Sequence, residues 1–189
     1  MLYFWKEEIN AMRYYLLIFL IIIGAILSCE RDDICASETE TTPKLIIDFY
    51  DISNQENAKS VNHIWVQGVG NSEPLGDYTG NNSEASIELP LKTDAVSTQF
   101  SIYKDFAINN NGTPSDPDDD YVTGNEDIIT ITYNPEQVYV SRACGYKTIY
   151  KNVVVSVTND GDNWIQLIQS VDDIQTVENE REAHFKIYH

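Results

Sequence analysis

The chain has 189 residues, of which 42% are hydrophobic and 11% are aromatic, so it can build one folded domain rather than remain disordered. The 12 Lys and Arg residues stand against 30 Asp and Glu residues, which gives a formal net charge of −18. Nucleic-acid binders need a basic surface, so this charge excludes nucleic acid as a partner.

The first predicted element is an apolar export signal. Residues 14–27 contain no charged side chain, follow Arg13, and form a run too short for an ordinary bilayer span of roughly 20 apolar residues. Initiation at Met12 gives a more typical signal than initiation at Met1, because two glutamates then fall outside it. We predict that residues 1–28 are a cleaved signal peptide, and the alternative is an uncleaved membrane anchor.

The residues at the end of this run, Ile26-Leu27-Ser28-Cys29, resemble the bacterial lipobox. In proteins with that signal the cysteine sulfur is acylated, and a signal peptidase cuts just before the cysteine. The resemblance therefore implies that the mature protein begins at Cys29 and contacts the membrane through lipid on this residue. Several acyl chains hold a protein firmly on a membrane, whereas a single chain binds only marginally.

Residues 29–43 are rich in Glu, Thr and Ser, end at Pro43, and are predicted to form an acidic polar tether. A short charged motif follows the cysteine directly: Glu30, Arg31, Asp32 and Asp33. This motif resembles the signal that sends lipoproteins of Bacteroidota to the cell surface, and an ordinary polar tether is the equal alternative. The predicted location is the outer membrane of a Gram-negative bacterium. If the motif is a surface-export signal, the protein is displayed on the cell surface.

Beyond the tether the hydrophobic period is two, which is typical of half-buried strands. The segment 44–51 places Leu45, Ile47 and Phe49 on one face. The segment 84–91 carries outward Pro90, which cannot donate to a ladder, so it is predicted to be an edge strand or to end there. Its predicted inward residues are Ala85, Ile87, Leu89 and Leu91.

Further strands are predicted at 61–67, 96–104, 127–133, 137–141, 148–157 and 183–189. Inward residues of the second and third are Val96, Phe100, Ile102, Ile129, Ile131 and Tyr133. The segment 163–171 fits a strand or a helix, and 171–182 fits a helix or a loop. We predict an all-β fold over residues 44–189, an antiparallel β-sandwich of about eight or nine strands, with a closed β-barrel as the alternative.

Six short sequences carry a resemblance to a known family: CERDDIC, PKLIIDFYD, IELPLK, SRACGYK, NWI and AHFKIYH. Together they make residues 29–189 similar to an uncharacterised lipoprotein family of Bacteroidota, a domain of unknown function. The resemblance implies the same compartment and a β-rich fold. It implies no activity and no catalytic residues.

Two cysteines remain once Cys29 is assigned to lipid, namely Cys35 and Cys144. Because the bacterial envelope is oxidising, we predict a disulfide between them, which closes a loop of about 110 residues and adds roughly 4.7 kcal/mol by chain entropy. Two separate thiols, with Cys144 packed as a small apolar residue, are the alternative.

The acidic segment 116–127 has the spacing of an EF-hand-like calcium loop. Its candidate ligands, at positions one, three, five and twelve, are Asp116, Asp118, Asp120 and Asp127. Tyr121 stands where the loop requires glycine, and the flanks are not helical. An acidic, solvated hairpin loop is therefore the favoured interpretation, and no cofactor other than this calcium alternative is predicted.

The histidines His63, His184 and His189 do not have the spacing of a zinc site, and no nucleophile elbow or metalloprotease motif occurs. We therefore predict a non-enzymatic binding or structural protein, whose partner is an envelope protein or a polysaccharide. The alternative of a glycan-binding accessory module depends on four aromatic residues that are able to stack on sugar rings: Trp65, Trp164, Tyr78 and Tyr121.

Overall fold

The computed structural model describes residues 15–16, 18–20, 34–36, 39 and 41–189. The chain divides into two compact units, one of residues 1–39 with 140–145 and one of residues 40–139 with 146–189. The described residues between 15 and 20 are helical. Within the described ranges, no helix combines the length and the apolar content that crossing a membrane requires.

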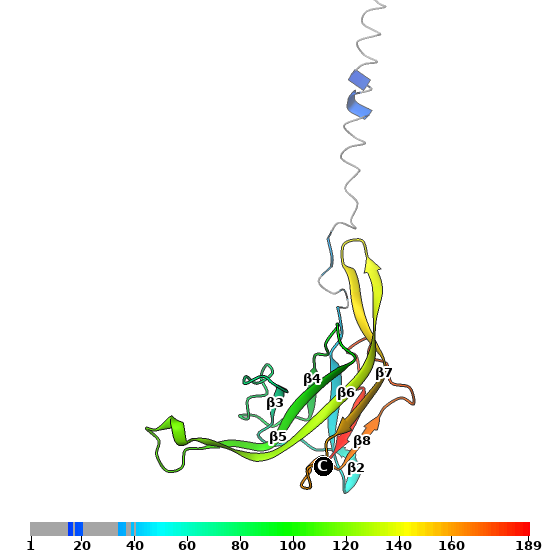
Figure 1. Cartoon of the computed structure of the whole chain (residues 1–189). Helices are drawn as coiled ribbons and strands as arrows, with labels where there is room; N and C mark the ends of the chain where they lie inside the picture. Colours follow the sequence, from blue (N-terminus) through cyan, green and yellow to red (C-terminus); the bar gives the residue numbers. More distant parts are fainter. Residues whose placement is uncertain (1–14, 17, 21–33, 37–38, 40) are drawn as a thin grey trace, which may run out of the picture. The chain divides into compact units, whose positions relative to one another are not determined.

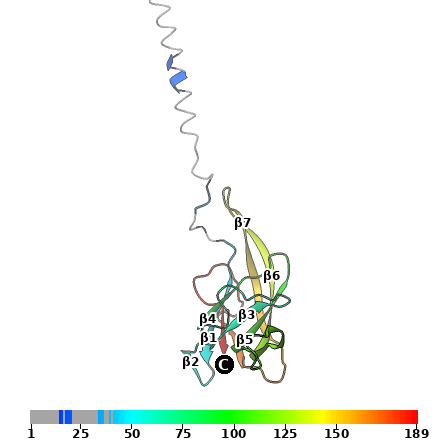
Figure 2. The same ribbon diagram turned by 90° about the vertical axis from the view of Figure 1, so that its left-hand side faces the viewer.

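The larger unit is an all-β sandwich of two sheets, which confirms the predicted fold class (Figures 1 and 2). In the first sheet the strands run in the order β2-β1-β9-β8, and β4 also pairs with β1. The strands of this sheet are β1 (Leu45–Asp51), β2 (Asn54–Ala58), β4 (Ser86–Leu89), β8 (Leu167–Ser170) and β9 (Phe185–Tyr188). The β1–β9 pair is parallel, which the prediction of an antiparallel sandwich did not include.

The second sheet has the order β3-β5-β6-β7. Its strands are β3 (Trp65–Gly68), β5 (Ser97–Asn109), β6 (Tyr121–Ser141) and β7 (Gly145–Val157), and a short 3-10 turn, η2 (Pro117–Asp119), lies between β5 and β6. The chain thus has nine strands within the described ranges. Figure 2 shows the two sheets as neighbouring layers, with β1 and β4 in one and β3 and β5 in the other.

The core lies between these layers and follows the predicted alternation. Ile47 of β1 and Ile87 of β4, together with Ile129 and Ile131 of β6, are fully buried. Because alternate residues of a strand point to opposite faces, one face of each sheet supplies the core and the other is left for solvent or partners. The core also includes the buried residues Leu45, Phe49, Leu89, Phe100, Ile102, Phe185 and Ile187.

Two predicted core residues lie outside the core. Val96 precedes β5 and is 66% exposed, and Thr98 takes the first buried position of that strand. Ala85 precedes β4 and is exposed as well. Both residues have the correct parity, but each stands one residue before its strand begins, and its side chain is left exposed at the margin of the sandwich.

The predicted strands 127–133 and 137–141 are parts of one strand, β6. Pro135 is tolerated inside it because β5 pairs only as far as Thr132, and the N–H of Tyr133 reaches the carbonyl of Val96 at 3.0 Å. The backbone nitrogen of Pro135 faces the same edge of β6 as the N–H of Tyr133, the edge toward β5. The ladder with β5 has ended there, so the missing N–H of proline costs no hydrogen bond.

The structure decides between the alternatives for the segments 163–171 and 171–182. Residues 167–170 form β8, so the strand alternative holds for the segment 163–171. Residues 171–182 form a loop without helix. At the start of the sandwich, Thr42 Oγ1 accepts from Thr148 N–H at 3.0 Å and Pro43 is buried. The last residues of the predicted tether are therefore packed on the sandwich.

Candidate binding surface

The hairpin of β5 and β6 continues beyond the rest of its sheet as a two-stranded ribbon, which we call the arm (residues 105–125; Figure 1). A β-bulge between Lys104 and Ala107 marks its start. Opposite the bulge, Gly124 has φ +112°, and a Cβ there would lie 2.8 Å from the carbonyl oxygen of Lys104. Only glycine fits this position, so the bend at the base of the arm depends on Gly124.

Both neighbouring strands stop at the base of the arm. On the β5 side, β3 pairs with β5 only as far as Tyr103. Just before β3, the carbonyls of Asn62 and His63 accept hydrogen bonds from the backbone N–H groups of Asp105 and Phe106. On the β6 side, β7 ends at Val157, and Thr158 N–H donates to the carbonyl of Ile128 at 2.8 Å. Within the described residues the outer part of the arm therefore has only its own two strands.

An apolar row runs along the outer face of the second sheet and onto the arm. We call it the outer stripe, and its members are Trp65, Tyr103, Phe106, Ile108 and Val122. Trp65 pairs with Tyr103, and Ile108 pairs with Val122, so the members of each pair lie on the same face. Val122 has the parity opposite to that of the buried residues of β6, which places it on the outer face.

The base of the outer stripe is a packed aromatic cluster. Phe106 stacks on Trp65 with ring centroids 4.3 Å apart, and it meets Tyr103 edge to face at 5.6 Å. Gly80 has φ +77°, and a Cβ there would overlap the ring of Phe106. A recess of about 520 Å³ adjoins this cluster and extends to Ile108.

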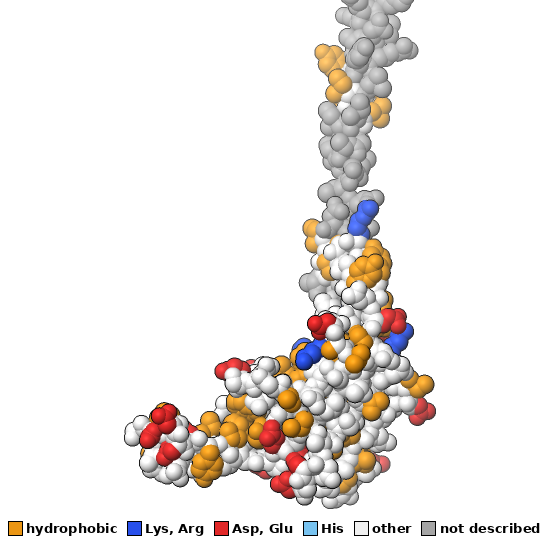
Figure 3. All heavy atoms as spheres, in the orientation of Figure 1, with side chains coloured by type: hydrophobic (Ala, Val, Ile, Leu, Met, Phe, Trp, Pro, Cys, Tyr) orange, Lys and Arg blue, Asp and Glu red, His pale blue; other side chains and the backbone are white. Residues whose placement is uncertain are grey.

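Beyond the cluster the outer stripe is open to solvent. Ile108 is 61% exposed and Val122 is 51% exposed. Figure 3 shows hydrophobic side chains along the arm and acidic side chains at its tip. Because this exposed pair continues the packed aromatic cluster as one apolar row, the outer stripe is a candidate surface for contact with another molecule.

Polar groups lie beside the aromatic cluster on the same face. The hydroxyl of Ser101 donates to the carboxylate of Glu126, and Trp65 Nε1–H donates to Gln67 Oε1 at 3.0 Å. Burial is the main cause that raises the pKa of Tyr103, and the hydrogen bond with the Glu126 carboxylate raises it further. These bonds fix the orientation of side chains at the base of the outer stripe.

The four aromatic residues of the glycan hypothesis do not form one platform. Trp164 is only 6% exposed and donates its Nε1–H to the carbonyl of Ile102 at 3.3 Å, so it belongs to the core. The hydroxyl of Tyr78 accepts from Glu88 N–H at 2.9 Å, and burial raises the pKa of Tyr78. Tyr121 lies on the opposite face of the arm from Val122, and one ring face of Trp65 is covered by Phe106.

The candidate calcium ligands are likewise separated. Asp116 Oδ1 accepts from the N–H of Asp118 at the tip of the arm, next to Asp120. Asp127 is fully buried in β6, where it accepts from Ile165 N–H at 2.7 Å and from an asparagine side chain. Burial raises the pKa of Asp127. No group of three or more metal-binding side chains occurs among the described residues, so the calcium hypothesis has no assembled site in this structure.

Two of the three histidines are buried in separate places. His184 Nδ1 accepts from Ile46 N–H at 3.0 Å, and burial lowers the pKa of this imidazole. His189 packs edge to face against Trp164 at 5.6 Å, and burial lowers its pKa as well. His63 is exposed and lies 3.0 Å, through Nδ1, from the carbonyl oxygen of Gly80.

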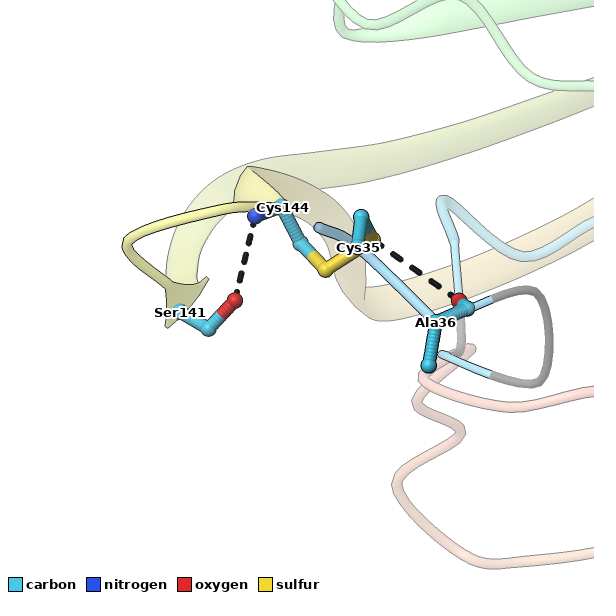
Figure 4. Close-up of a disulfide and its surroundings, with 4 residues drawn as sticks. All are labelled: Cys35, Ala36, Ser141 and Cys144. Carbon is cyan, nitrogen blue, oxygen red and sulfur yellow. Dashed lines mark hydrogen bonds between the residues drawn. A yellow bond between two sulfur atoms is a disulfide. The ribbon is translucent and has the colours of Figure 1, made fainter. Parts of the chain in front are cut away.

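The predicted disulfide between Cys35 and Cys144 is present (Figure 4). Their Cα atoms are 4.9 Å apart, although 109 residues separate them in sequence. Cys144 lies in the turn between β6 and β7, where its N–H donates to Ser141 Oγ at 3.0 Å. The predicted lipidation residue Cys29 and the motif 30–33 lie outside the described residues.

The sequence by itself did not reveal the outer stripe. A local signal existed, because apolar residues flank the acidic loop on both sides, at 106–108 and at 121–122. Without the hairpin register that signal looks like the ends of two ordinary strands. The pairing of Ile108 with Val122 turns it into one exposed face.

A family model described as a family of unknown function (DUF6452) matches residues 63–189. This region begins after β1 and β2, so the central strand β1 of the first sheet lies outside the matched residues. No curated protein and no solved structure matches the chain.

Proposed function

The chain belongs to the family of unknown function DUF6452, and because membership assigns no activity, we propose from the chain's own residues that it is a non-enzymatic, lipid-anchored outer-membrane protein that binds a protein partner through the outer stripe. The exposed Ile108–Val122 pair on the arm carries the binding part of this proposal. Aliphatic side chains gain by burial against another apolar surface, at roughly 25 cal/mol per Å² removed from water.

The membrane part rests on the sequence around Cys29. The lipobox-like residues 26–29 predict acylation, and the acidic mature chain disfavours direct adsorption on anionic lipid. The Cys35–Cys144 disulfide supports export, because such bonds persist in oxidising compartments. The resemblance to Bacteroidota lipoproteins supports the outer membrane as the destination.

A protein partner is a better match than a glycan. Sugar rings stack on exposed aromatic faces, but Trp164 is buried and one face of Trp65 is covered by Phe106. The most exposed members of the outer stripe are aliphatic instead. A glycan partner remains the second outcome of the binding test below.

The anchoring test compares wild type with Cys29→Ala in cells fed an alkyne-labelled fatty acid. Wild type should carry the label and migrate as the processed form, while the variant should lack label and accumulate as precursor. Equal processing of the two would overturn the lipid anchor. Protease treatment of intact cells, with Asp32→Ala/Asp33→Ala as the comparison, tests surface display, and a wild-type protein that resists shaving argues against it.

The binding test places a photo-crosslinking amino acid at Ile108 in living cells, with the exposed position Glu56 of β2 as the matched control. A discrete protein adduct at position 108 and none at position 56 is expected. The same cross-linked products at both positions would contradict a specific protein partner at the outer stripe. A cross-linked product that contains polysaccharide would contradict it as well.

A further inference from the structure

One edge of the arm has backbone groups that face solvent. In β6 the carbonyl of Ile128 faces β7, because it accepts from Thr158 N–H. Alternate residues of a strand turn their N–H and C=O groups to the same edge, so those of Val122 and Gly124 face this side too. Since β7 ends at Val157, its ladder does not reach residues 121–124.

The neighbouring loop covers this edge only at its base. Asn125 Nδ2–H donates to the carbonyl of Asp162 at 2.7 Å. Beyond Asn125, no backbone or side-chain hydrogen bond from another element reaches 121–124 within the described residues, except for the pairing with β5. We call residues 121–124 the free edge.

Proteins commonly protect such an edge with lysine, with proline in the strand, or with a covering element. The free edge has the sequence Tyr-Val-Thr-Gly, and residues 105–126 contain no Lys or Arg. An unprotected strand edge next to an exposed apolar pair is a template for an added strand, in which backbone bonds give affinity and alternate side chains give specificity.

The charge around the free edge indicates which strand fits. Residues 105–126 include six carboxylates: Asp105, Asp116, Asp118, Asp119, Asp120 and Glu126. Figure 3 shows acidic side chains at the tip of the arm. A second copy of the arm would bring like charges together, which disfavours self-pairing, whereas Lys and Arg side chains at the ends of an added strand would meet carboxylates on both sides.

We propose that the free edge of β6 binds an extended segment of a partner protein in which basic and apolar residues alternate. The segment adds as a strand beside residues 121–124, and its apolar side chains extend the outer stripe next to Val122. Its basic side chains lie on the opposite face, within reach of the carboxylates at the acidic tip. This inference rests on the proposed function, because it names the chemistry of the protein partner.

The test measures binding of fluorescent peptides to the purified full chain in detergent, at low and at high salt. The probe is a peptide of alternating Lys and Val, of about eight residues, which is an ordinary strand length. Its charge control alternates Glu and Val. Two further probes keep every side chain but carry N-methyl groups on the Lys amides or on the Val amides, and therefore block one edge or the other.

Strand addition predicts that the Lys/Val peptide binds, that the Glu/Val peptide does not, and that the two N-methylated peptides differ by about tenfold or more in Kd. Binding should weaken with added salt. Equal binding of both N-methylated peptides would overturn the proposal, since charge alone would then explain the affinity. Absence of Lys/Val binding would overturn it as well.

A matched pair of variants locates the site. Val122→Pro removes the outward N–H, and Val122→Ala removes only side-chain atoms. Val122→Pro should raise the Kd of the Lys/Val peptide about tenfold more than Val122→Ala does, because both variants lose the valine side chain but only the proline also loses the N–H. If Val122→Pro unfolds the arm, the N-methylated probes still decide on the wild-type chain. Equal effects of the two variants would contradict pairing at this edge.

The remaining outcomes separate this inference from the proposed function. A protein adduct at position 108 without discrimination among the peptides leaves the proposed function in place and removes the strand-addition model. Failure of both tests removes both. A chain that sediments as a dimer, and that Val122→Pro converts to a monomer, would make a second copy the occupant and overturn the basic partner.

Discussion

Phe106 lies flat on Trp65, with ring centroids 4.3 Å apart and an angle of 16° between the ring planes. The contact joins the base of the arm to β3, because Phe106 lies in the β-bulge of β5 and Trp65 begins the neighbouring strand. Stacked aromatic pairs contribute about 0.5–1.5 kcal/mol beyond their buried area. The direction of the arm, and with it the position of the outer stripe, therefore depends on this pair.

Gly80→Ala should destabilise the protein more than Gly112→Ala. Both glycines have positive φ, +77° and +81°, so each alanine pays a similar backbone cost of about 1–2 kcal/mol. At position 80 the new Cβ would also overlap the ring of Phe106, whereas nothing lies within 4 Å at position 112. We expect an additional loss of about 1–3 kcal/mol for Gly80→Ala, measured by denaturant unfolding. Equal losses would show that Phe106 moves aside freely.

Phe106→Ala should loosen the arm without unfolding the sandwich. The substitution removes both aromatic contacts at the base of the arm, and an isolated two-stranded hairpin is only marginally stable. Hydrogen exchange of residues 107–123 should accelerate about tenfold or more, while the strand centres at 45–51 and 129–133 remain protected. Ile108→Ala, which truncates an exposed residue, is the control and should leave exchange nearly unchanged. Uniform acceleration across both sheets would contradict a local role.

Stability should fall as the pH drops below about 6.5, because two buried histidines are neutral in the folded state. Burial lowers the pKa of His184 and of His189 below the ordinary value of 6.5, so the unfolded chain binds protons first. Their contribution is complete above pH 6.5 and is lost as the pH falls toward the lowered folded-state pKa values.

The check is the free energy of unfolding between pH 7.5 and pH 5.5, compared with that of His184→Asn. An Asn side-chain oxygen can replace the imidazole nitrogen that accepts from Ile46 N–H, but it does not titrate. The variant should show a shallower pH dependence than wild type over this range. Parallel curves would exclude His184 as a source of the effect.

Reduction of the Cys35–Cys144 disulfide should lower the melting temperature. The bond spans 109 residues, for which the chain-entropy model gives about 4.7 kcal/mol, and measured losses often fall below that value. Cys35→Ser and Cys144→Ser should destabilise equally, and the double variant should be no worse than either, since all three remove the same bond. A costly Cys144→Ser beside a silent Cys35→Ser would instead assign the loss to packing of Cys144.

The sequence alone determined the local properties of this protein. Alternation along β1 and β6 predicted strands and the buried residues Ile47, Ile129 and Ile131, because the strand period of two is a property of the backbone itself. The pairing of Cys35 with Cys144 was also predictable, since two cysteines remain once Cys29 is assigned to lipid.

Only the tertiary structure decided which faces are covered. Trp65 and Trp164 have similar strand-like surroundings in sequence, yet Trp164 is buried in the core and Trp65 lies on the outer face. The parallel β1–β9 pair joins segments that are more than a hundred residues apart, and no local pattern encodes it. The arm exists because β3 and β7 end before the β5–β6 hairpin does, and strand ends depend on where neighbouring layers stop. Burial and edge exposure are set by contacts between distant segments, and the sequence specifies those contacts only through the complete fold.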